Sequence, residues 1–113
     1  MIPSRETRIL DVGLAMQIPD GYVGLICSRS GLAAKHAVFV LNAPGVIDSD
    51  YRGEIKIILI NSGPQPFYYR EGDRIAQMMF IRHESPCFRE VWHLNDTERG
   101  EGGFGSTGVA KPA

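Results

Sequence analysis

The sequence predicts an all-β fold, built as an antiparallel sandwich or barrel, and three observations lead to that prediction. Short apolar runs recur along residues 7–94, and clusters of Gly, Pro, Asp and Ser separate them. Helical composition is confined to residues 31–36, which are too few to hold a helix without tertiary support. Closely spaced short strands with little helix are typical of β-sandwiches and barrels.

The strongest strand signal is residues 54–61, which alternate at first and then become wholly apolar. This change is expected where a strand passes from a half-exposed into a buried environment. Turns are expected at residues 19–21 and 62–66, because both contain the Pro and Gly that favour them. The predicted strands, in chain order, are residues 7–10, 14–18, 22–27, 37–41, 54–61, 67–69, 74–81 and 89–94.

Residues 45–54 (Gly-Val-Ile-Asp-Ser-Asp-Tyr-Arg-Gly-Glu) are predicted to form a β-hairpin. Asp, Ser and Gly adopt the turn conformations that β-branched residues resist, and apolar segments flank them. The hairpin would hold Asp48 behind Ile47 and place Tyr51 beyond the bend. Taken alone, the segment is more simply explained as a solvated turn.

Length, charge and cysteine content narrow the class of protein. A chain of 113 residues forms one domain, and a net charge of −1 lacks the positive field that binding of nucleic-acid polymers needs. No apolar run could span a membrane and residues 1–15 do not resemble a signal peptide, so we expect a cytoplasmic protein without a membrane partner. Cys27 and Cys87 stand apart without a metal-ligand pattern, which predicts two buried, reduced thiols.

The composition changes at Asn95, which divides the chain into a β-barrel domain, residues 1–95, and a tail, residues 96–113. Five glycines and one large apolar side chain, Phe104, fall between residues 96 and 108. Glycine loses more backbone entropy on ordering than any other residue. The tail is therefore expected to be mobile until something is bound.

Two familiar binding motifs are excluded by the residues around them. Residues 100–105 match Gly-x-Gly-x-x-Gly, but a dinucleotide fingerprint needs a helix after it and an acid about twenty residues on, and too little chain remains. Residues 48–53 begin like a calcium loop, yet Arg52 and Leu59 occupy positions that require oxygen ligands. Neither nucleotide binding by a Rossmann motif nor calcium binding is predicted.

Phosphate-binding chemistry fits two segments better. Residues 28–31 (Ser-Arg-Ser-Gly) offer a guanidinium, two hydroxyls and the backbone N–H groups of a turn. Arg99 precedes the glycine run, which the hydroxyls of residues 106–107 follow. Either segment alone is more simply a solvated turn. Together they supply two cationic contacts for phosphate, with Asp48 as a carboxylate and Phe104 as an aromatic lid.

The order of these segments resembles that of the motifs of the trimeric deoxyuridine triphosphatase (dUTP pyrophosphatase) family. Residues 28–33 resemble its second motif, 45–54 its third, 72–77 its fourth and 99–108 its fifth. Ser28 stands where the family usually has Pro. The family's first motif, an Ala-Gly-x-Asp-Leu-like segment, is not found in this sequence.

The resemblance implies a jelly-roll-like β-barrel that hydrolyses dUTP to dUMP and pyrophosphate. It implies that Asp48 is the general base for the attacking water and that Tyr51 packs under the deoxyribose, leaving no room for a 2′-hydroxyl. Asn42 would read uracil, and Phe104 would stack on it as the tail closes. The residues implied to be catalytic are Asp48 and Gln77, and those implied to bind substrate are Arg29, Ser30, Gly31, Asn42, Gly45, Val46, Ile47, Tyr51, Arg99, Phe104, Gly105, Ser106 and Thr107.

The resemblance also implies a magnesium ion held through substrate phosphates and water, and a homotrimer whose active sites are shared between subunits. Two alternatives remain open at this point. One is a catalytically impaired module of the same fold that binds dUTP or serves in regulation. The other is a nucleotide deaminase acting on dCTP, against which the Tyr51 segment and the glycine-rich tail argue.

Overall fold

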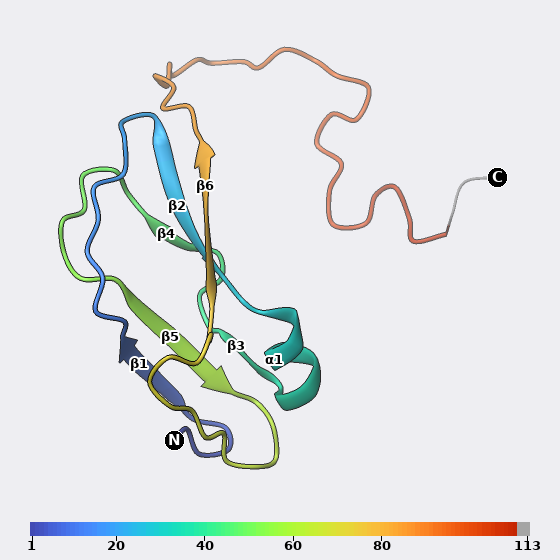
Figure 1. Ribbon diagram of the computed structural model, residues 1–113. Helices are drawn as coiled ribbons and strands as arrows, with labels where there is room; N and C mark the ends of the chain where they lie inside the picture. Colours follow the sequence, from blue (N-terminus) through green and yellow to red (C-terminus); the bar gives the residue numbers. More distant parts are fainter. Residues whose placement is uncertain (111–113) are drawn as a thin grey trace.

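The computed structural model describes residues 1–110 and contains two three-stranded antiparallel sheets and one short helix (Figure 1). The strands are β1 (Thr7–Asp11), β2 (Tyr22–Cys27), β3 (Val38–Val40), β4 (Gly45–Ile47), β5 (Lys56–Asn61) and β6 (Gln77–Arg82), and the helix is α1 (Ser30–His36). This architecture confirms the all-β prediction. In residues 1–110, no helix has the length and apolar character needed to cross a bilayer.

The first sheet has β5 at its centre, between β1 and β3. Alternation along β5 turns Ile57 and Leu59 into the core and leaves Ile58 and Ile60 half-buried on the opposite face. The strand predicted for residues 54–61 is thus confirmed over Lys56–Asn61, and it is the central strand of this sheet.

The second sheet has β2 at its centre, between β4 and β6. Ile26 of β2 is buried and lies opposite Gly45 on one side and Met78 on the other. A Cβ atom added to Gly45 would lie 3.3 Å from the Cβ of Ile26. Glycine therefore allows β4 to approach the core side of β2 closely.

The hydrophobic core lies between the two sheets and takes residues from both. Its buried members are Ile2, Ile26, Val38, Val40, Ile55, Ile57 and Leu59. The fully buried Asn61 ends β5, and its amide group donates to the carbonyls of Ile2 (2.9 Å) and Gln65 (2.8 Å). Its carbonyl oxygen accepts from the N–H of Gly63 (2.9 Å), so one side chain joins the N-terminal segment and the 62–66 turn to the core.

The hairpin predicted for residues 45–54 is wrong. β4 pairs with β2 in one sheet, whereas β5 pairs with β1 and β3 in the other, so residues 48–55 cross from sheet to sheet. The partner of β4 lies about twenty residues earlier in the chain, and local turn composition does not reveal such a pairing. We call residues 48–55 the crossover loop.

Three predicted strands are also wrong. Residues 14–18 run beside Ile55, whose N–H donates to the Leu14 carbonyl (2.7 Å), without joining a sheet. Residues 67–69 are reduced to an isolated bridge between Phe67 and Ile2. Residues 89–94 lie exposed beyond the end of β6, with no strand beside them in the described part of the chain. In each case the segment lacks the continuous ladder of backbone hydrogen bonds that a strand requires.

The helix α1 has the tertiary support that so short an element needs. Leu32 packs against the hydrophobic core, while the remaining surface of the helix is exposed. The helix ends at His36 and is capped by Ala37, whose backbone is left-handed (φ 55°) and whose N–H donates to the Ala33 carbonyl (3.1 Å). The helical composition of residues 31–36 therefore does form a helix.

The prediction of two buried thiols is wrong, although both cysteines are free. Cys27 is half-buried on β2, and Cys87 is exposed beyond β6. The alternation of β2 places Cys27 on its outer face, opposite Gln77, rather than in the core.

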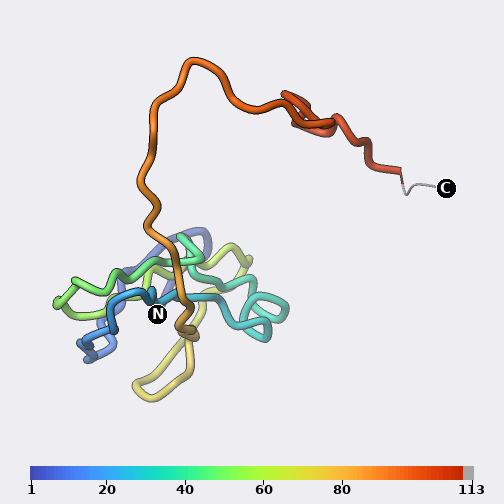
Figure 2. The backbone as a smooth tube through the Cα atoms, turned by 90° about the horizontal axis from the view of Figure 1, so that it is seen from above, coloured from blue at the N-terminus to red at the C-terminus, as the bar shows by residue number. Residues whose placement is uncertain are grey.

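Residues 83–110 form an extended arm that leaves the two sheets (Figure 2). The radius of gyration of the Cα atoms is 19.4 Å, whereas a compact domain of this length has about 13 Å. Phe88 and Trp92 on the arm are 96% and 98% exposed. The predicted domain boundary at residue 96 stays a prediction, and residues 111–113 of the predicted tail lie outside the described residues.

Candidate active site

A cavity of about 230 Å³ opens where β4 runs into the crossover loop. It is lined by Val46, Ile47, Asp48, Tyr51, Glu54 and Lys56. Asp48 directly follows the last residue of β4, and its side chain is exposed to solvent. The structure thus gathers the predicted general base, the predicted sugar-binding tyrosine and two predicted substrate-binding residues around one cavity.

Hydrogen bonds within the crossover loop fix the position of Tyr51. Its N–H donates to the Asp48 carbonyl (3.1 Å), and its hydroxyl donates to the Glu54 carbonyl (2.7 Å). The guanidinium of Arg52 donates to the carbonyls of Ser49 (2.6 Å) and Tyr51 (3.1 Å). Asp48 and Tyr51 are therefore held by the backbone of one tight loop rather than by separate elements.

The base of the loop is anchored to the end of β1. Lys56 forms an ion pair with Asp11, and the Glu54 carboxylate accepts from the Gly13 N–H (3.2 Å). The hydrogen bond and charge of Asp11 raise the pKa of the exposed Lys56 ammonium above its usual value of 10.5. Sequence reasoning missed Glu54 and Lys56 as cavity residues, because the register that sets Asp11 opposite Lys56 is visible only in the folded sheet.

Asn42 precedes β4 and lies beside its first residue. A Cβ atom on Gly45 would be 3.3 Å from the side-chain nitrogen of Asn42, so the glycine leaves room for the amide. The two predicted substrate-binding residues are thus neighbours, but neither lines the cavity around Asp48.

The other predicted catalytic residue, Gln77, belongs to a second group. Its side-chain amide donates to the Ser28 carbonyl (2.7 Å), and the Ser28 hydroxyl accepts from the Val40 N–H (2.9 Å). Ser30 and Gly31 follow in the first turn of α1, and both are exposed. Gln77 is therefore bonded to the turn that carries the predicted phosphate-binding residues.

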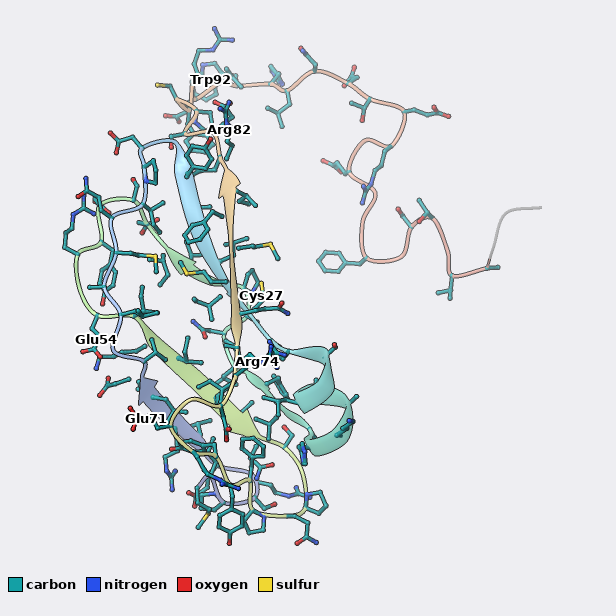
Figure 3. All side chains as sticks on the ribbon, viewed as in Figure 1. Cys27, Glu54, Glu71, Arg74, Arg82 and Trp92 are labelled. Carbon is teal, nitrogen blue, oxygen red and sulfur yellow. The ribbon has the colours of Figure 1, made fainter. Side chains whose placement is uncertain are left out.

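Arg29 and Gly31 line a different, larger cavity of about 590 Å³ with a cationic rim. Lys35 and Arg74 also contribute to its walls. In Figure 3, Arg74 lies near the middle of the molecule, apart from Glu54 beside the first cavity. Within a single chain, the residues near Asp48 and the residues near Arg29 are not brought together.

The predicted tail residues lie away from both cavities. Phe104 is fully exposed, and the hydrogen bonds around it are local. The side chain of Arg99 donates to the Gly102 carbonyl (2.7 Å), and the N–H of Ser106 donates to the Gly103 carbonyl (3.1 Å). Gly105 and Thr107 are likewise exposed, on an arm that points away from the sheets in Figure 1.

The side chains of residues 1–110 include no group of three or more His, Cys, Asp or Glu residues placed to hold a metal ion. Asp48 and Glu54 supply single carboxylates at the first cavity. Magnesium that is bound with a nucleotide typically takes one or two carboxylates and keeps substrate phosphates and waters as its other ligands. The donor set fits an ion carried by a triphosphate better than one held in a protein cage.

Comparison with known proteins decides the family. A family model described as dUTPase matches residues 1–108. The chain belongs to the dUTPase family. Its jelly-roll β fold is shared with solved dUTPases, among them the dUTPase of Staphylococcus bacteriophage 80alpha with dUpNHpp. That structure has a TM-score of 0.81 and 29% sequence identity, over 96% of this chain and 79% of the phage chain.

Two bacterial relatives carry the name deoxyuridine 5′-triphosphate nucleotidohydrolase. The Rickettsia felis protein is 49% identical over 108 residues, which are 96% of this chain and 73% of the relative. The Cutibacterium acnes protein is 47% identical over 106 residues, which are 93% of this chain and 70% of the relative. The resemblance of the motifs to the dUTPase family is thus confirmed over residues 1–108 of this chain.

Proposed function

We propose that this chain is a dUTP diphosphatase, which hydrolyses dUTP to dUMP and pyrophosphate. The observation that carries the proposal is the cavity at the crossover loop, where Asp48 and Tyr51 line one space in a chain of the dUTPase family. A carboxylate beside an aromatic wall suits a water-activating base next to a sugar.

In the proposed mechanism Asp48 accepts a proton from a water molecule, whose oxygen attacks the α-phosphorus. A new P–O bond forms, and the bond from the α-phosphorus to the oxygen bridging the α- and β-phosphates breaks, so pyrophosphate leaves with that oxygen. General-base catalysis requires a carboxylate held within hydrogen-bond reach of its water. The bonds of the crossover loop hold the backbone of Asp48 and so limit its freedom.

Substrate recognition is assigned to the loop and to the strand before it. The ring of Tyr51 would pack under the deoxyribose and exclude a 2′-hydroxyl. The side chain of Asn42, with the backbone of residues 45–47, would pair with the uracil edge. Cytosine would place a donor opposite a donor there, and mispaired buried polar groups are costly.

A homotrimer with shared active sites would bring the two groups of residues together. Arg29, Ser30, Gly31 and Gln77 would contact phosphates from a neighbouring subunit. Two features support the assembly: the separation of the groups within one chain, and the exposed apolar surface of the second sheet. That surface includes Val46, Met79 and Ile81, which are 42–58% exposed and lie on one face of the sheet.

The C-terminal tail would close over the bound nucleotide. Arg99, Ser106 and Thr107 would hold the γ-phosphate, Gly105 would allow close approach of the backbone, and Phe104 would stack on uracil. Exclusion of water on closure strengthens the electrostatic stabilisation of the transition state. The full exposure of Phe104 in the free chain supports a tail whose contacts form only on binding.

Magnesium is the proposed cofactor, held through the substrate phosphates and water. When bound, it would supply Lewis-acid charge neutralisation and a template for the phosphates. An intracellular nucleotide substrate also accords with a cytoplasmic protein.

The test follows pyrophosphate release from dUTP, dCTP and UTP in the presence of magnesium, with Asp48→Asn as the matched variant. Release from dUTP alone, abolished in Asp48→Asn while nucleotide affinity is retained, supports the proposal. Binding of dUTP without turnover would indicate the regulatory module instead. Ammonia release from dCTP would indicate a deaminase, and removal of magnesium with EDTA should stop dUTP turnover.

A further inference from the structure

We infer that Gly53 is a positioning residue, which sets the sugar selectivity of the site by holding the ring of Tyr51. The inference rests on the proposed function, because it assigns the tyrosine ring to the wall beside the deoxyribose. Gly53 itself does not line the cavity. Its effect on the substrate would pass entirely through Tyr51.

The ring of Tyr51 lies directly against the backbone of Gly53. A Cβ atom added there would lie 2.6 Å from Cζ and 2.8 Å from Cε1 of the ring, and it would also collide with the hydroxyl oxygen. Real Cβ atoms essentially never approach other atoms so closely. The φ angle of Gly53 is outside the left-handed range, so the position needs glycine for space and not for its backbone conformation.

The hydroxyl end of the Tyr51 ring is held by Glu54, the residue after Gly53. The Tyr51 hydroxyl donates to the carbonyl of Glu54 (2.7 Å), and the Glu54 carboxylate accepts from the Gly13 N–H (3.2 Å). The N–H of Ile55 donates to the Leu14 carbonyl (2.7 Å), which fixes the loop to the neighbouring segment. The ring is therefore held at its hydroxyl by an anchored carbonyl, and along its edge by a residue without a side chain.

Little else restrains the ring on its outer side, because Tyr51 is 42% exposed. A methyl group at residue 53 would therefore displace the ring into solvent rather than distort the anchored backbone. Displacement would break the hydroxyl bond to Glu54 and open the wall of the cavity. An opened wall leaves room for a ribose 2′-hydroxyl that the seated ring excludes.

The experiment measures kcat and KM for dUTP and UTP in wild-type protein, Gly53→Ala, Tyr51→Ala and the double variant. For Gly53→Ala we expect the ratio of kcat/KM for dUTP over UTP to fall by about tenfold, since a pocket discriminates a small group by roughly that factor. KM for dUTP should rise while kcat changes by less than about threefold. Asp50→Ala, at an exposed residue of the same loop that does not line the cavity, is the matched control and should keep the wild-type ratio.

The double variant separates positioning from general loop damage. If Gly53 acts through the ring, adding Gly53→Ala to Tyr51→Ala should change the dUTP/UTP ratio no further. The inference would be overturned if the fold-changes of the two single variants in the dUTP/UTP ratio multiply in the double variant, or if Gly53→Ala leaves the ratio unchanged.

A second readout does not depend on activity. In the free wild-type protein, nuclear Overhauser contacts should connect the Tyr51 ring protons with the α-protons of Gly53, and in Gly53→Ala the ring should lose its contacts to the residue 53 backbone. If these contacts behave as expected but the wild-type protein does not hydrolyse dUTP, the proposed function fails while the ring placement holds. If the wild-type protein is selective and the ring stays seated in Gly53→Ala, only the inference fails.

Discussion

Replacement of Asn61 tests how the end of β5 holds the N-terminal segment and the 62–66 turn in place. Asn61→Ala removes a fully buried amide and leaves the carbonyls of Ile2 and Gln65 and the N–H of Gly63 without this partner. Three hydrogen bonds of about 1 kcal/mol each give an expected loss of about 3 kcal/mol in the free energy of unfolding. For a domain of this size the loss corresponds to a drop in Tm of roughly 12–20 °C.

Asn61→Asp keeps the shape and replaces the donating nitrogen with an oxygen that faces two carbonyl oxygens. Burial and these oxygens disfavour the charged carboxylate, so its pKa in the folded state should exceed the unfolded value of about 3.9. Stability relative to wild type is then highest below that unfolded value and falls as the pH rises through the raised folded pKa.

The assay is chemical denaturation of both variants and wild type at pH 4 and pH 7, at one fixed protein concentration because assembly shifts apparent stability. The deficit of Asn61→Asp should be larger at pH 7 than at pH 4, while that of Asn61→Ala should change little. A loss below about 1 kcal/mol for Asn61→Ala would refute the reasoning.

Three further predictions test the rest of the fold and the site. Deletion of residues 96–113 should abolish most dUTP turnover. It should leave Tm within a few degrees of the wild-type value, since Phe104 and its neighbours are exposed. Loss of a cooperative unfolding transition would count against this prediction. Ser28→Ala removes the acceptor of the Val40 N–H and should lower the free energy of unfolding by about 1 kcal/mol in denaturation; an unchanged midpoint would be inconsistent with that bond. Asp11 raises the pKa of Lys56, so the ion pair stabilises the fold below pH 10.5 and this contribution is lost as the pH rises through the folded pKa. The difference in stability between wild type and Lys56→Met should therefore shrink above pH 10.5. A difference that stays constant with pH would contradict this prediction.

Sequence reasoning found both central strands from the apolar residues that they bury, and it also found the largely exposed edge strands β1 and β6. The run at 56–61 is central and buried, and the apolar run at 22–27 is the central strand of the other sheet. Residues 96–110 are mostly exposed, and their glycine-rich composition offers little with which to form a core, while the predicted boundary at residue 96 stays a prediction. Local sequence patterns were sufficient to predict a segment where its own residues determine whether it is buried.

Features that depend on distant partners could not be read from the sequence. The crossover loop resembled a hairpin because β4 and β5 are separated by turn residues, yet each finds its partner elsewhere. Residues 89–94 have a strand-like composition but no neighbour in the described chain.

At the candidate active site, too, sequence reasoning missed the residues that depend on distant partners. Asp48 and Tyr51 were found through their motif, and the structure places them at one cavity. Glu54 and Lys56 were missed because their roles depend on contacts with Gly13 and Asp11, about forty residues earlier. The packing of Tyr51 on Gly53 is likewise invisible without the fold.

The most direct test of the central claim is hydrolysis of dUTP in water enriched in ¹⁸O, followed by mass analysis of both products. Attack at the α-phosphorus by water that Asp48 activates predicts one ¹⁸O atom in dUMP and none in pyrophosphate. Label in pyrophosphate would place the attack at the β-phosphorus and contradict the account.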